Sequence, residues 1–471
     1  MDILIMAGQL MLSLMILVTL HELGHFLPAR WFNTRVEKFY LFFDPWFSLF
    51  KARKVNGSWS FDSFLNKNKE YPDDRKDITE YGIGWLPLGG YVKISGMIDE
   101  SMDTEQMKQP PQPWEFRSKP AWQRLIIMLG GVTVNFILGF FLYAMVLWIW
   151  GEEYLPNENV KYGIFVDSLG MDMGLKDGDK VLAIGDQPFE KFNDRLVIRE
   201  VIINNANKLT VERDGKQIDL PIDPKFVKIL SSRDSKNKLL FGPRTPFGVE
   251  AVAKDSPAER AKIQKDDQII GFNDISTPYL TDFQKLARAN KNKDVVVMIL
   301  RNPDTLRLNM KITEDGRIGV EAKSYRYYFD YKRQEYTLGQ ALPLGITKGL
   351  GFLNDQLKAF GQMFRGKIKV SESLGGLGSI GGMFGAEWRW ERFWFMTAIL
   401  SLILAFMNLL PIPALDGGHV MFLLYEMISG RKPSDKFLEY ATTVGFVLVL
   451  GLIVYANGLD IWNAIKGFFG K

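Results

Sequence analysis

The residues of this chain with the clearest capacity for chemistry are His21, Glu22 and His25, which form the pattern His-Glu-x-x-His at the end of an apolar run. If that run is helical, the two histidines are four positions apart and share one face. Two imidazoles placed in this way can hold one zinc ion, and Glu22 can act as general base on a metal-bound water. The whole chain has only 3 histidines. A catalytic metal site is therefore favoured over a helix end that carries polar residues by chance.

A catalytic zinc needs a third protein ligand, and the arrangements of soluble metalloproteases are absent. An extended motif would need Gly and His where this chain has Pro28 and Trp31, and the alternative downstream glutamate is missing. The best remaining donor is Asp416, which follows two prolines at the end of a later apolar segment. His419, the third histidine, competes for the same role.

Four apolar blocks predict four transmembrane helices, at about residues 3–25, 125–150, 393–410 and 437–455. The basic n-region of a signal peptide is missing before the first block, which is therefore interpreted as a retained helix. Basic residues follow both the first block and the Asp416 segment. By the positive-inside rule, both motifs lie at the cytoplasmic side and the N-terminus faces out.

The composition restricts the function classes further. The 471 residues carry a net charge of +4, which is mild for this size, so no nucleic-acid partner is inferred. The absence of cysteine excludes disulfides, thiolate zinc sites and a cysteine nucleophile. Hydrophobic residues make up 47% of the chain and are gathered in blocks, which indicates a membrane protein with polar domains attached.

Residues 151–322 are soluble in character and contain an internal repeat at an offset of 88 residues. Leu175, Asp179, Val181, Leu182 and Asp186 recur as Ile263, Asp267, Ile269, Ile270 and Asp274. Alternating strands are predicted at 209–213 and 295–299. Each half resembles a PDZ domain, with the apolar segments 162–166 and 247–251 as possible carboxylate-binding loops. Such domains bind extended peptides, including C-terminal peptides, by strand addition. The alternative is that the two halves are steric spacers.

Several other segments carry weaker signals. Residues 82–92 are apolar but rich in Gly and Pro, which predicts extended, hairpin-like backbone that lies at membrane depth against protein or a wet cavity, or else an ordinary cytoplasmic hairpin. Asn135 is a polar residue inside the second apolar block, and it either bonds between helices or lines the zinc cavity. Residues 337–367 are interpreted as one or two surface helices. The glycine-rich stretch 374–385 is interpreted as a flexible loop.

Two motifs together resemble the site-2 protease family of intramembrane zinc metalloproteases: the HELGH of residues 21–25 and the NLLPIPALDGGH of residues 408–419. The stretches WLPLGGYVK (85–93) and KPAWQR (119–124), with the tandem PDZ-like insert, resemble the bacterial branch of sigma-E regulator proteases. Three features depart from the family. The pattern Gly-Pro-x-x-Asn is present at 131–135 without its proline, the corresponding Gly-Pro after the PDZ-like region is replaced around 374–376, and the segment 41–80 is longer than usual.

The resemblance implies zinc (Zn2+) held by His21, His25 and Asp416, with Glu22 as the catalytic residue. It also implies a membrane-reentrant β-hairpin near 82–92 that pairs with the unwound substrate, and a role for Asn408 in holding that substrate. The expected substrate-binding residues are Asn408, Gly82, Ile83, Gly84, Trp85, Leu86 and Asn135.

The expected fold is a polytopic α-helical membrane protein with four transmembrane helices, a membrane-reentrant β-hairpin and two tandem PDZ-like β-rich domains. The expected segments are 1–25 (first transmembrane helix), 26–120 (cytoplasmic side, with the hairpin), 121–150 (second helix), 151–230 and 231–322 (PDZ-like domains), 323–387 (surface helices and Gly-rich loop), 388–430 (third helix) and 431–471 (fourth helix and tail).

The expected function is zinc-dependent cleavage of transmembrane segments of pre-trimmed single-pass proteins, of the anti-sigma-factor type, or of remnant signal peptides. The expected partners are these substrates, membrane lipid and C-terminal peptide ligands of the PDZ-like domains. The expected location is the bacterial inner membrane, with the PDZ-like domains on the periplasmic side and the zinc site near the cytoplasmic side. The competing hypothesis is a membrane adaptor whose zinc is structural, which the intact Glu22 argues against.

Overall fold

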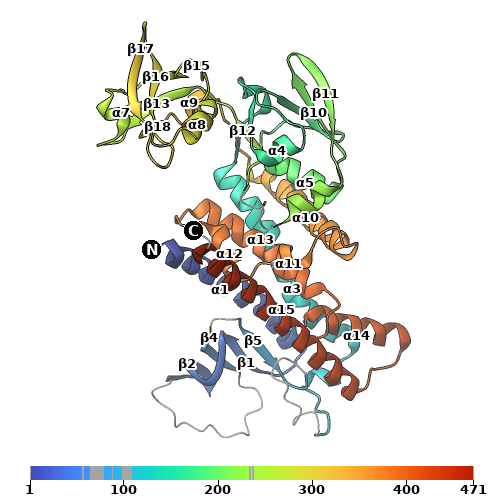
Figure 1. Ribbon diagram of the computed structural model, residues 1–471. Coiled ribbons are helices and arrows are strands. Elements are labelled where there is room, and N and C mark those ends of the chain that lie inside the picture. The colour runs from blue at the N-terminus through green and yellow to red at the C-terminus, as the bar shows by residue number, and fades with distance from the viewer. Residues whose placement is uncertain are drawn as a thin grey trace. The chain divides into compact units, whose positions relative to one another are not determined.

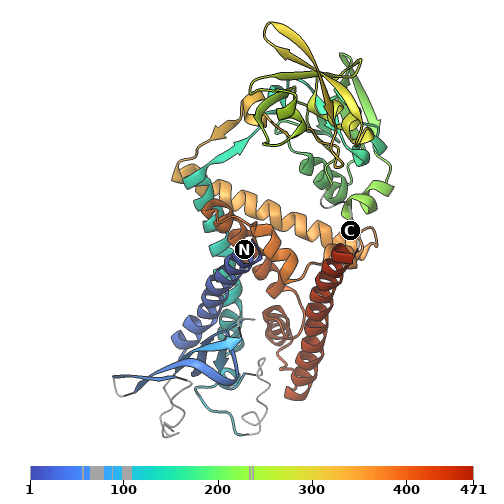
Figure 2. The same cartoon turned by 60° about the vertical axis from the view of Figure 1, so that its left-hand side comes forward.

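The computed structural model describes residues 2–55, 58–63, 79–86, 89–97, 109–232, 235 and 238–469. The chain divides into two compact units, whose elements are labelled in Figure 1 and seen from a second direction in Figure 2. Unit 1 comprises Met1–Gly151, Glu335–Gln356 and Leu374–Lys471, and unit 2 comprises Glu152–Gln334 and Leu357–Ser373. Each unit is described by itself below.

Unit 1 is built on helices rich in apolar residues. Among the described residues, 4 helices are long and apolar enough to cross a membrane: α1 (Asp2–Trp31), α3 (Ala121–Trp150), α13 (Trp390–Leu409) and α15 (Asp435–Phe469). Two of them exceed the expected lengths. The first helix continues through Pro28 to Trp31, and the fourth helix continues well beyond residue 455.

Glycines allow these helices to approach each other closely. A Cβ atom built on Gly24 of α1 would lie 2.5 Å from the carbonyl oxygen of Gly130 on α3, so only glycine fits at this crossing. Such small residues are typical of helix packing in membranes. The hydroxyl of Ser401 on α13 donates a 2.7 Å hydrogen bond to the carbonyl oxygen of Asn135 on α3, where both groups are buried. α3 is therefore fixed between α1 and α13.

The glycine-rich stretch 374–385 is not the flexible loop that the sequence suggests. It contains helix α12 (Leu377–Phe384), whose Phe384 is fully buried with Leu10 and Phe393. Its backbone is tied to α15, because Asn457 accepts a hydrogen bond from the N–H of Leu377 and Asp460 accepts one from Ser379. Glycine lowers helix propensity, but here tertiary packing outweighs that preference.

Three more helices lie in the C-terminal part of the chain. α10 (Leu338–Phe364) is one long helix in the region expected to hold one or two; it begins in unit 1 and ends in unit 2, and α11 (Val370–Ser373) follows it in unit 2. After α13 the chain breaks at Pro411 and Pro413 and passes through Ala414, which has a φ of 87°. α14 then runs over Asp416–Ser429. Asp416 therefore stands in the first turn of a new helix, where a carboxylate is favoured by the helix dipole.

A five-stranded sheet lies beyond the C-terminal end of α1 (Figure 1). Its strand order is β3-β2-β4-β1-β5, with β1 (Val36–Leu41), β2 (Phe43–Val55), β3 (Ser58–Ser63), β4 (Glu80–Leu86) and β5 (Tyr91–Ile94). The 3₁₀ turn η1 (Phe116–Ser118) follows before α3. The hairpin expected at 82–92 is wrong in its topology. β4 and β5 do not pair with each other, because β1 lies between them, parallel to β4 and antiparallel to β5.

Unit 2 consists of two β-rich halves related by the predicted repeat. The first half contains β7 (Ile164–Val166), α4 (Ser168–Asp172), β8 (Lys180–Ile184), β9 (Gln187–Pro188), α5 (Asp194–Asn204), β10 (Lys208–Arg213), β11 (Lys216–Pro221), α6 (Lys225–Ser231) and β12 (Phe241–Pro243). The second half contains β13 (Phe247–Val252), α7 (Pro257–Arg260), β14 (Gln268–Phe272), β15 (Ile275–Ser276), α8 (Leu280–Ala289), β16 (Asp294–Arg301), β17 (Asp304–Lys311) and β18 (Val320–Ala322).

Each half of the repeat contains an equivalent ion pair between an arginine and a buried aspartate. In the first half, Arg213 donates to both carboxylate oxygens of Asp179, at 2.7 and 2.8 Å. In the second half, Arg301 contacts Asp267 in the same way, at 2.7 Å to each oxygen. Both aspartates are fully buried. The recurring aspartates of the sequence therefore hold a strand and a loop together at equivalent places in the two halves.

Two expectations for unit 2 need correction. The first half does not end at residue 230, because β12 pairs with β7 and so belongs to it. The segments 162–166 and 247–251 are not free loops. β13 pairs with β14 on one side and with β18 on the other, and β7 pairs with β12 while Ile164 bonds to the backbone of Asp179. Among the described strands, β12 and β18 each lie at an edge, as do β9 and β11 in the first half and β17 in the second.

The strand that leads into the two halves pairs with the strand that leads out of them. β6 (Glu152–Tyr154) pairs antiparallel with β19 (Lys332–Gln334). The short turns η2 (Asn157–Asn159) and α9 (Tyr325–Tyr328) adjoin these strands. The repeat is thus inserted between two paired strands.

Candidate metal centre

Three predicted ligands converge in unit 1. The Nε2 atoms of His21 and His25 are 3.2 Å apart, and Oδ2 of Asp416 lies 3.3 Å from the first and 3.4 Å from the second. All three side chains are largely buried. Among the described residues, they form the one group of three or more ligand side chains close enough to hold a metal ion.

The geometry of this triangle fits a zinc ion. Four ligands placed tetrahedrally at roughly 2.0–2.1 Å from zinc are separated from each other by about 3.3–3.4 Å. The observed sides of 3.2 to 3.4 Å agree with that spacing. Oδ2 of Asp416 is buried and has no hydrogen-bond partner among the described residues, although both imidazoles are near it. The three atoms therefore point toward a common centre more than toward one another.

The outer nitrogen of each imidazole has a partner that keeps Nε2 available. Nδ1 of His25 lies 2.8 Å from the carbonyl oxygen of Ile127, which can only accept, so Nδ1 carries the proton. Nδ1 of His21 faces the side-chain amide of Asn135 at 3.2 Å. Such outer contacts fix the tautomer and the ring orientation of histidine ligands. Asn135 thus contacts His21, and it also lines the cavity described below.

Gly131 of α3 has no side chain, and the two imidazoles occupy the space that a side chain would fill. A Cβ atom built on Gly131 would lie 2.3 Å from Nε2 of His25 and 2.7 Å from Cε1 of His21. No side chain fits there without moving the rings. The sequence analysis identified Gly131 as the first residue of the family pattern at 131–135, but assigned it no role at the metal centre.

The position of Asp416 depends on a tight turn. A Cβ atom on Gly417 would lie 2.3 Å from the carbonyl oxygen of Leu410, and one on Gly418 would lie 2.6 Å from that of Ile412. These glycines let α14 begin directly against the end of α13. His419 lines the same cavity but is not part of the ligand group. The structure therefore brings Asp416, and not His419, to the two imidazoles.

A cavity of about 840 Å³ adjoins the three ligands. Glu22 lies in its wall beside His21 and His25, so a carboxylate is available next to the ligand triangle. Asn408 lines the cavity as well, and its Nδ2 is 3.3 Å from Nε2 of His21. The far wall is formed by the sheet, including Leu86, Gly89, Gly90, Tyr91, Val92, Lys93 and Ile94.

The sheet residues expected to pair with a substrate differ in whether they reach the cavity. Gly82 and Ile83 pair with β1 on one side and with β2 on the other, so their backbone is not available to another strand. Gly84 and Leu86 also pair with β2, and the indole of Trp85 donates to the carbonyl oxygen of Pro45. Leu86 alone of this set lines the cavity.

The open edge of the sheet on the cavity side is β5. Among the described strands, β5 pairs only with β1. A Cβ atom built on Gly90, just before β5, would lie 3.7 Å from Cγ of Glu22. The edge strand therefore starts beside Glu22. The sequence analysis placed substrate pairing in a hairpin at 82–92, which includes Tyr91 and Val92 of β5, but its substrate-binding residues in that hairpin were only Gly82 to Leu86.

Comparison with known proteins agrees with this geometry. The sequence matches the model of peptidase family M50 over residues 9–65 and 72–452. It is 26% identical to the regulator of sigma-E protease RseP of Escherichia coli over 473 residues, covering 97% of both chains. It is 26% identical to the regulator of sigma E protease of Haemophilus influenzae over 467 residues, covering 95% of this chain and 97% of the relative. A candidate zinc metalloprotease of Ralstonia nicotianae is also 26% identical, over 491 residues and 97% of both chains.

Proposed function

Because this chain belongs to peptidase family M50, a family of zinc-dependent proteases, we propose that it cleaves transmembrane segments within or at the edge of the bilayer. Its substrates are single-pass proteins that have already been trimmed outside the membrane, of the anti-sigma-factor type, or remnant signal peptides. The observation that carries this proposal is the ligand triangle of His21, His25 and Asp416, which joins α1 to the start of α14.

In this proposal His21, His25 and Asp416 hold the zinc ion and Glu22 is the catalytic base. Zinc held there supplies a Lewis acid that polarises the scissile carbonyl and raises the acidity of water. Glu22 accepts the proton of the attacking water, which its place in the cavity wall beside both histidines permits. Asn408 holds the substrate backbone near the same atoms, since its amide lies at the edge of the ligand triangle.

A transmembrane helix conceals its peptide bonds in internal hydrogen bonds, so cleavage requires local unwinding. The unwound segment needs replacement partners for its backbone. We assign this role to the open edge of β5 (Tyr91–Ile94), because that strand begins next to Glu22 and lines the cavity. In this arrangement the reentrant part of the sheet is the cavity-lining edge formed by β5 and the residues before it.

The two halves of unit 2 are proposed to be PDZ-like domains on the periplasmic side of the inner membrane. Basic residues near the C-terminal end of α1 and after α14 favour a cytoplasmic location for the metal centre. α3 then carries the chain across the membrane to residue 152. The halves admit substrates whose outer domain is already removed, and the outer edges of β12 and β18 are where C-terminal peptides would add as strands.

The decisive test is Glu22→Gln in the full-length protein, reconstituted with a model transmembrane peptide. The expected result is loss of cleavage with zinc content unchanged, because the amide keeps the size of the side chain and lacks its basicity. Glu391→Gln, at an acidic residue in the first turn of α13, is the matched control and should cleave normally. Cleavage by the Glu22→Gln protein at the parental rate would remove Glu22 from the mechanism.

A further inference from the structure

The two faces of the five-stranded sheet differ sharply in chemistry. The strand register places Phe50 opposite Ile83, and Ala52 opposite both Tyr81 and Phe61. Because side chains alternate along a strand, these residues share one face with their second neighbours. This aromatic face comprises Phe39, Leu41, Phe50, Ala52, Trp59, Phe61, Tyr81, Ile83, Trp85 and Val92, together with two polar residues, Lys54 and Ser63.

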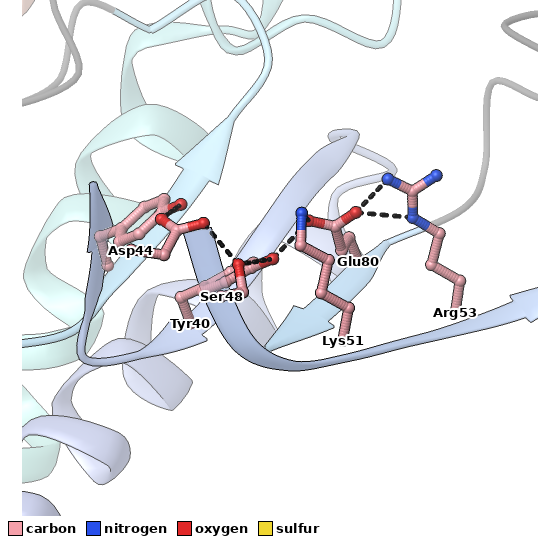
Figure 3. A network of polar contacts seen from close by, with 7 residues as sticks. Tyr40, Asp44, Ser48, Lys51, Arg53 and Glu80 are labelled. Carbon is pink, nitrogen blue, oxygen red and sulfur yellow. Dashed lines mark hydrogen bonds and ion pairs between the residues drawn. The ribbon is translucent and has the colours of Figure 1, made fainter. Parts of the chain in front are cut away.

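The opposite face is polar, and hydrogen bonds and ion pairs connect several of its residues. Glu80 accepts hydrogen bonds from Tyr40 and Arg53 and forms an ion pair with Lys51, and Ser48 donates to Asp44 (Figure 3). Burial by itself would raise the pKa of Glu80, but the hydrogen bonds from Tyr40 and Arg53 outweigh it and lower that pKa. The sheet is therefore amphipathic across its thickness.

The aromatic face is more exposed than the polar face, which is the reverse of a sheet in water. Trp59 is 51% exposed and Phe61 is 60% exposed, whereas Glu80 is 3% exposed. The exposed rings contact one another: Phe61 meets Phe50 at 5.7 Å and Trp59 at 6.3 Å, and Trp59 meets Tyr81 at 5.8 Å between ring centroids. Contiguous exposed apolar surface of this kind marks an interaction site.

The aromatic face is also continuous with a membrane-spanning helix. Phe26 of α1 packs on Phe39 at 5.5 Å and on Tyr81 at 6.1 Å. α1 therefore rises from the aromatic side of the sheet. Phe26 lies near the C-terminal end of α1, beyond the roughly 20 residues that cross the hydrocarbon core. In Figure 2 the strands of this sheet extend sideways from that end of α1. The uncovered part of the face is thus at the level of the membrane surface and turned toward it.

We propose that the hairpin of β2 and β3 is an interfacial anchor that lays its aromatic face into the headgroup region of the bilayer beside α1. Tryptophan and tyrosine favour this zone, where the ring is apolar and its polar atom meets water. Lys54 lies opposite Trp59 at the end of the hairpin and can reach the phosphates of anionic lipids. This inference rests on α1 spanning a membrane and is independent of proteolysis.

The chain contains no cysteine, so single-cysteine variants can be labelled cleanly. Phe61→Cys and Trp59→Cys place a fluorophore on the aromatic face, and Ser60→Cys, between them on β3, places it on the other face. The full-length protein is reconstituted in vesicles that contain anionic lipid, with a quencher attached to the lipid near the headgroup or dissolved in water. Peptide cleavage by each variant is measured in parallel as a check of folding.

The expected result alternates along β3. The lipid-borne quencher should act several times more strongly on labels at 59 and 61 than on the label at 60, and the water-soluble quencher should show the reverse order. Equal quenching at all three positions would overturn the proposal. Protection of labels 59 and 61 from both quenchers would also overturn it, because a protein partner or a second copy would then cover the face. Since cleavage is read separately, loss of the proposed protease function would not alter this outcome.

Discussion

Asn135 of α3 faces His21 of α1, with its Nδ2 atom 3.2 Å from Nδ1 of the imidazole, while the amide oxygen is buried and has no hydrogen-bond partner in the described chain. A half-turn of the amide places the oxygen where it accepts the Nδ1–H of His21. That exchange gives the Nδ1–H of His21 an acceptor and leaves the lone pair of His21 on Nε2, the atom that faces Asp416. Asn135 is therefore a positioning residue for the metal centre.

Replacing this amide should weaken metal binding. We expect Asn135→Leu to lower zinc affinity by about 10- to 100-fold, because His21 then loses the contact that fixes its tautomer. The measurement is competition with a chelator of known affinity, using purified full-length protein. Asn135→Asp keeps an acceptor at the same place and should bind zinc nearly as the parent does. Parental affinity in the leucine variant would show that His21 needs no support from α3.

Gly131→Ala should abolish zinc binding and cleavage together. The added Cβ would lie 2.3 Å from Nε2 of His25, and neither the ring nor the helix backbone can yield that much without breaking the ligand triangle. Zinc content and peptide cleavage are measured on the same preparation. Gly8→Ala on α1 is the matched control, since a Cβ atom there meets nothing within 4 Å. An alanine variant at 131 that retains stoichiometric zinc would contradict the observed placement of the imidazoles.

The buried pair of Asp267 and Arg301 should stabilise the second half of unit 2 in a pH-dependent way. Burial by itself would raise the pKa of Asp267, but the hydrogen bonds from Arg301 and from the backbone N–H of Gln264, together with the charge of Arg301, outweigh burial and lower that pKa below the ordinary value of 3.8. We expect Asp267→Asn to cost about 2 kcal/mol at pH 7, the range of a hydrogen bond to a charged group. Amide hydrogen exchange across residues 247–322 measures this local free energy.

A carboxylate with a lowered folded pKa stabilises the fold above its unfolded pKa and loses that effect as the pH falls through the folded value. The difference between the parent and Asp267→Asn should therefore shrink below pH 3.8 and vanish in stronger acid. Asp274→Asn is the control, because Asp274 and its partner Arg307 are both largely exposed and such pairs contribute little. A constant difference down to strong acid would mean that the charge of Asp267 is not what stabilises the repeat.

Excision of the repeat should widen the range of substrates. Tyr154 pairs with Lys332 in the short ladder of β6 and β19, so residues 155–331 can be replaced by a short Gly-rich turn without separating the flanking strands. If the halves exclude proteins with an intact outer domain, the shortened protein should cleave both trimmed and untrimmed substrates. Cleavage of the two substrate forms is compared in vesicles. An unchanged preference for the trimmed form would assign the two halves to spacing alone.

The local spacing of residues in the sequence predicted part of the fold and part of the metal centre. The i, i+4 histidines define one helix face, and α1 bears both on it. The recurrence at 88 residues likewise reflects strands and turns that are repeated locally. The convergence of Asp416 with His21 could not follow from spacing, because it depends on how α14 packs against α3 and α13. Elimination of other donors favoured Asp416 and left His419 as an alternative, and the family resemblance then implied Asp416. The insertion of β1 between β4 and β5 has the same cause, since strand pairing over such separations has no local signature.

The prediction of a flexible loop at 374–385 was wrong for a physical reason that concerns glycine. A run rich in glycine predicts loop because glycine gives up more backbone entropy on folding than other residues. At the N-cap of α12 that cost is offset by a close approach that glycine alone permits: a Cβ atom on Gly376 would lie 2.8 Å from Cα of Asn457. Such compensation is invisible until the neighbouring helix is in place.

The two imidazoles and the carboxylate of the ligand triangle stand near opposite ends of the chain, which sets the order in which they are synthesised. A ribosome that has completed α1 and α3 has made His21, His25 and Glu22, but it has not yet made Asp416. With the ligands proposed above, a chain that ends before α14 lacks the third ligand and should be inert toward neighbouring proteins in the membrane. Proteolytic capacity would then be acquired only when translation is almost complete.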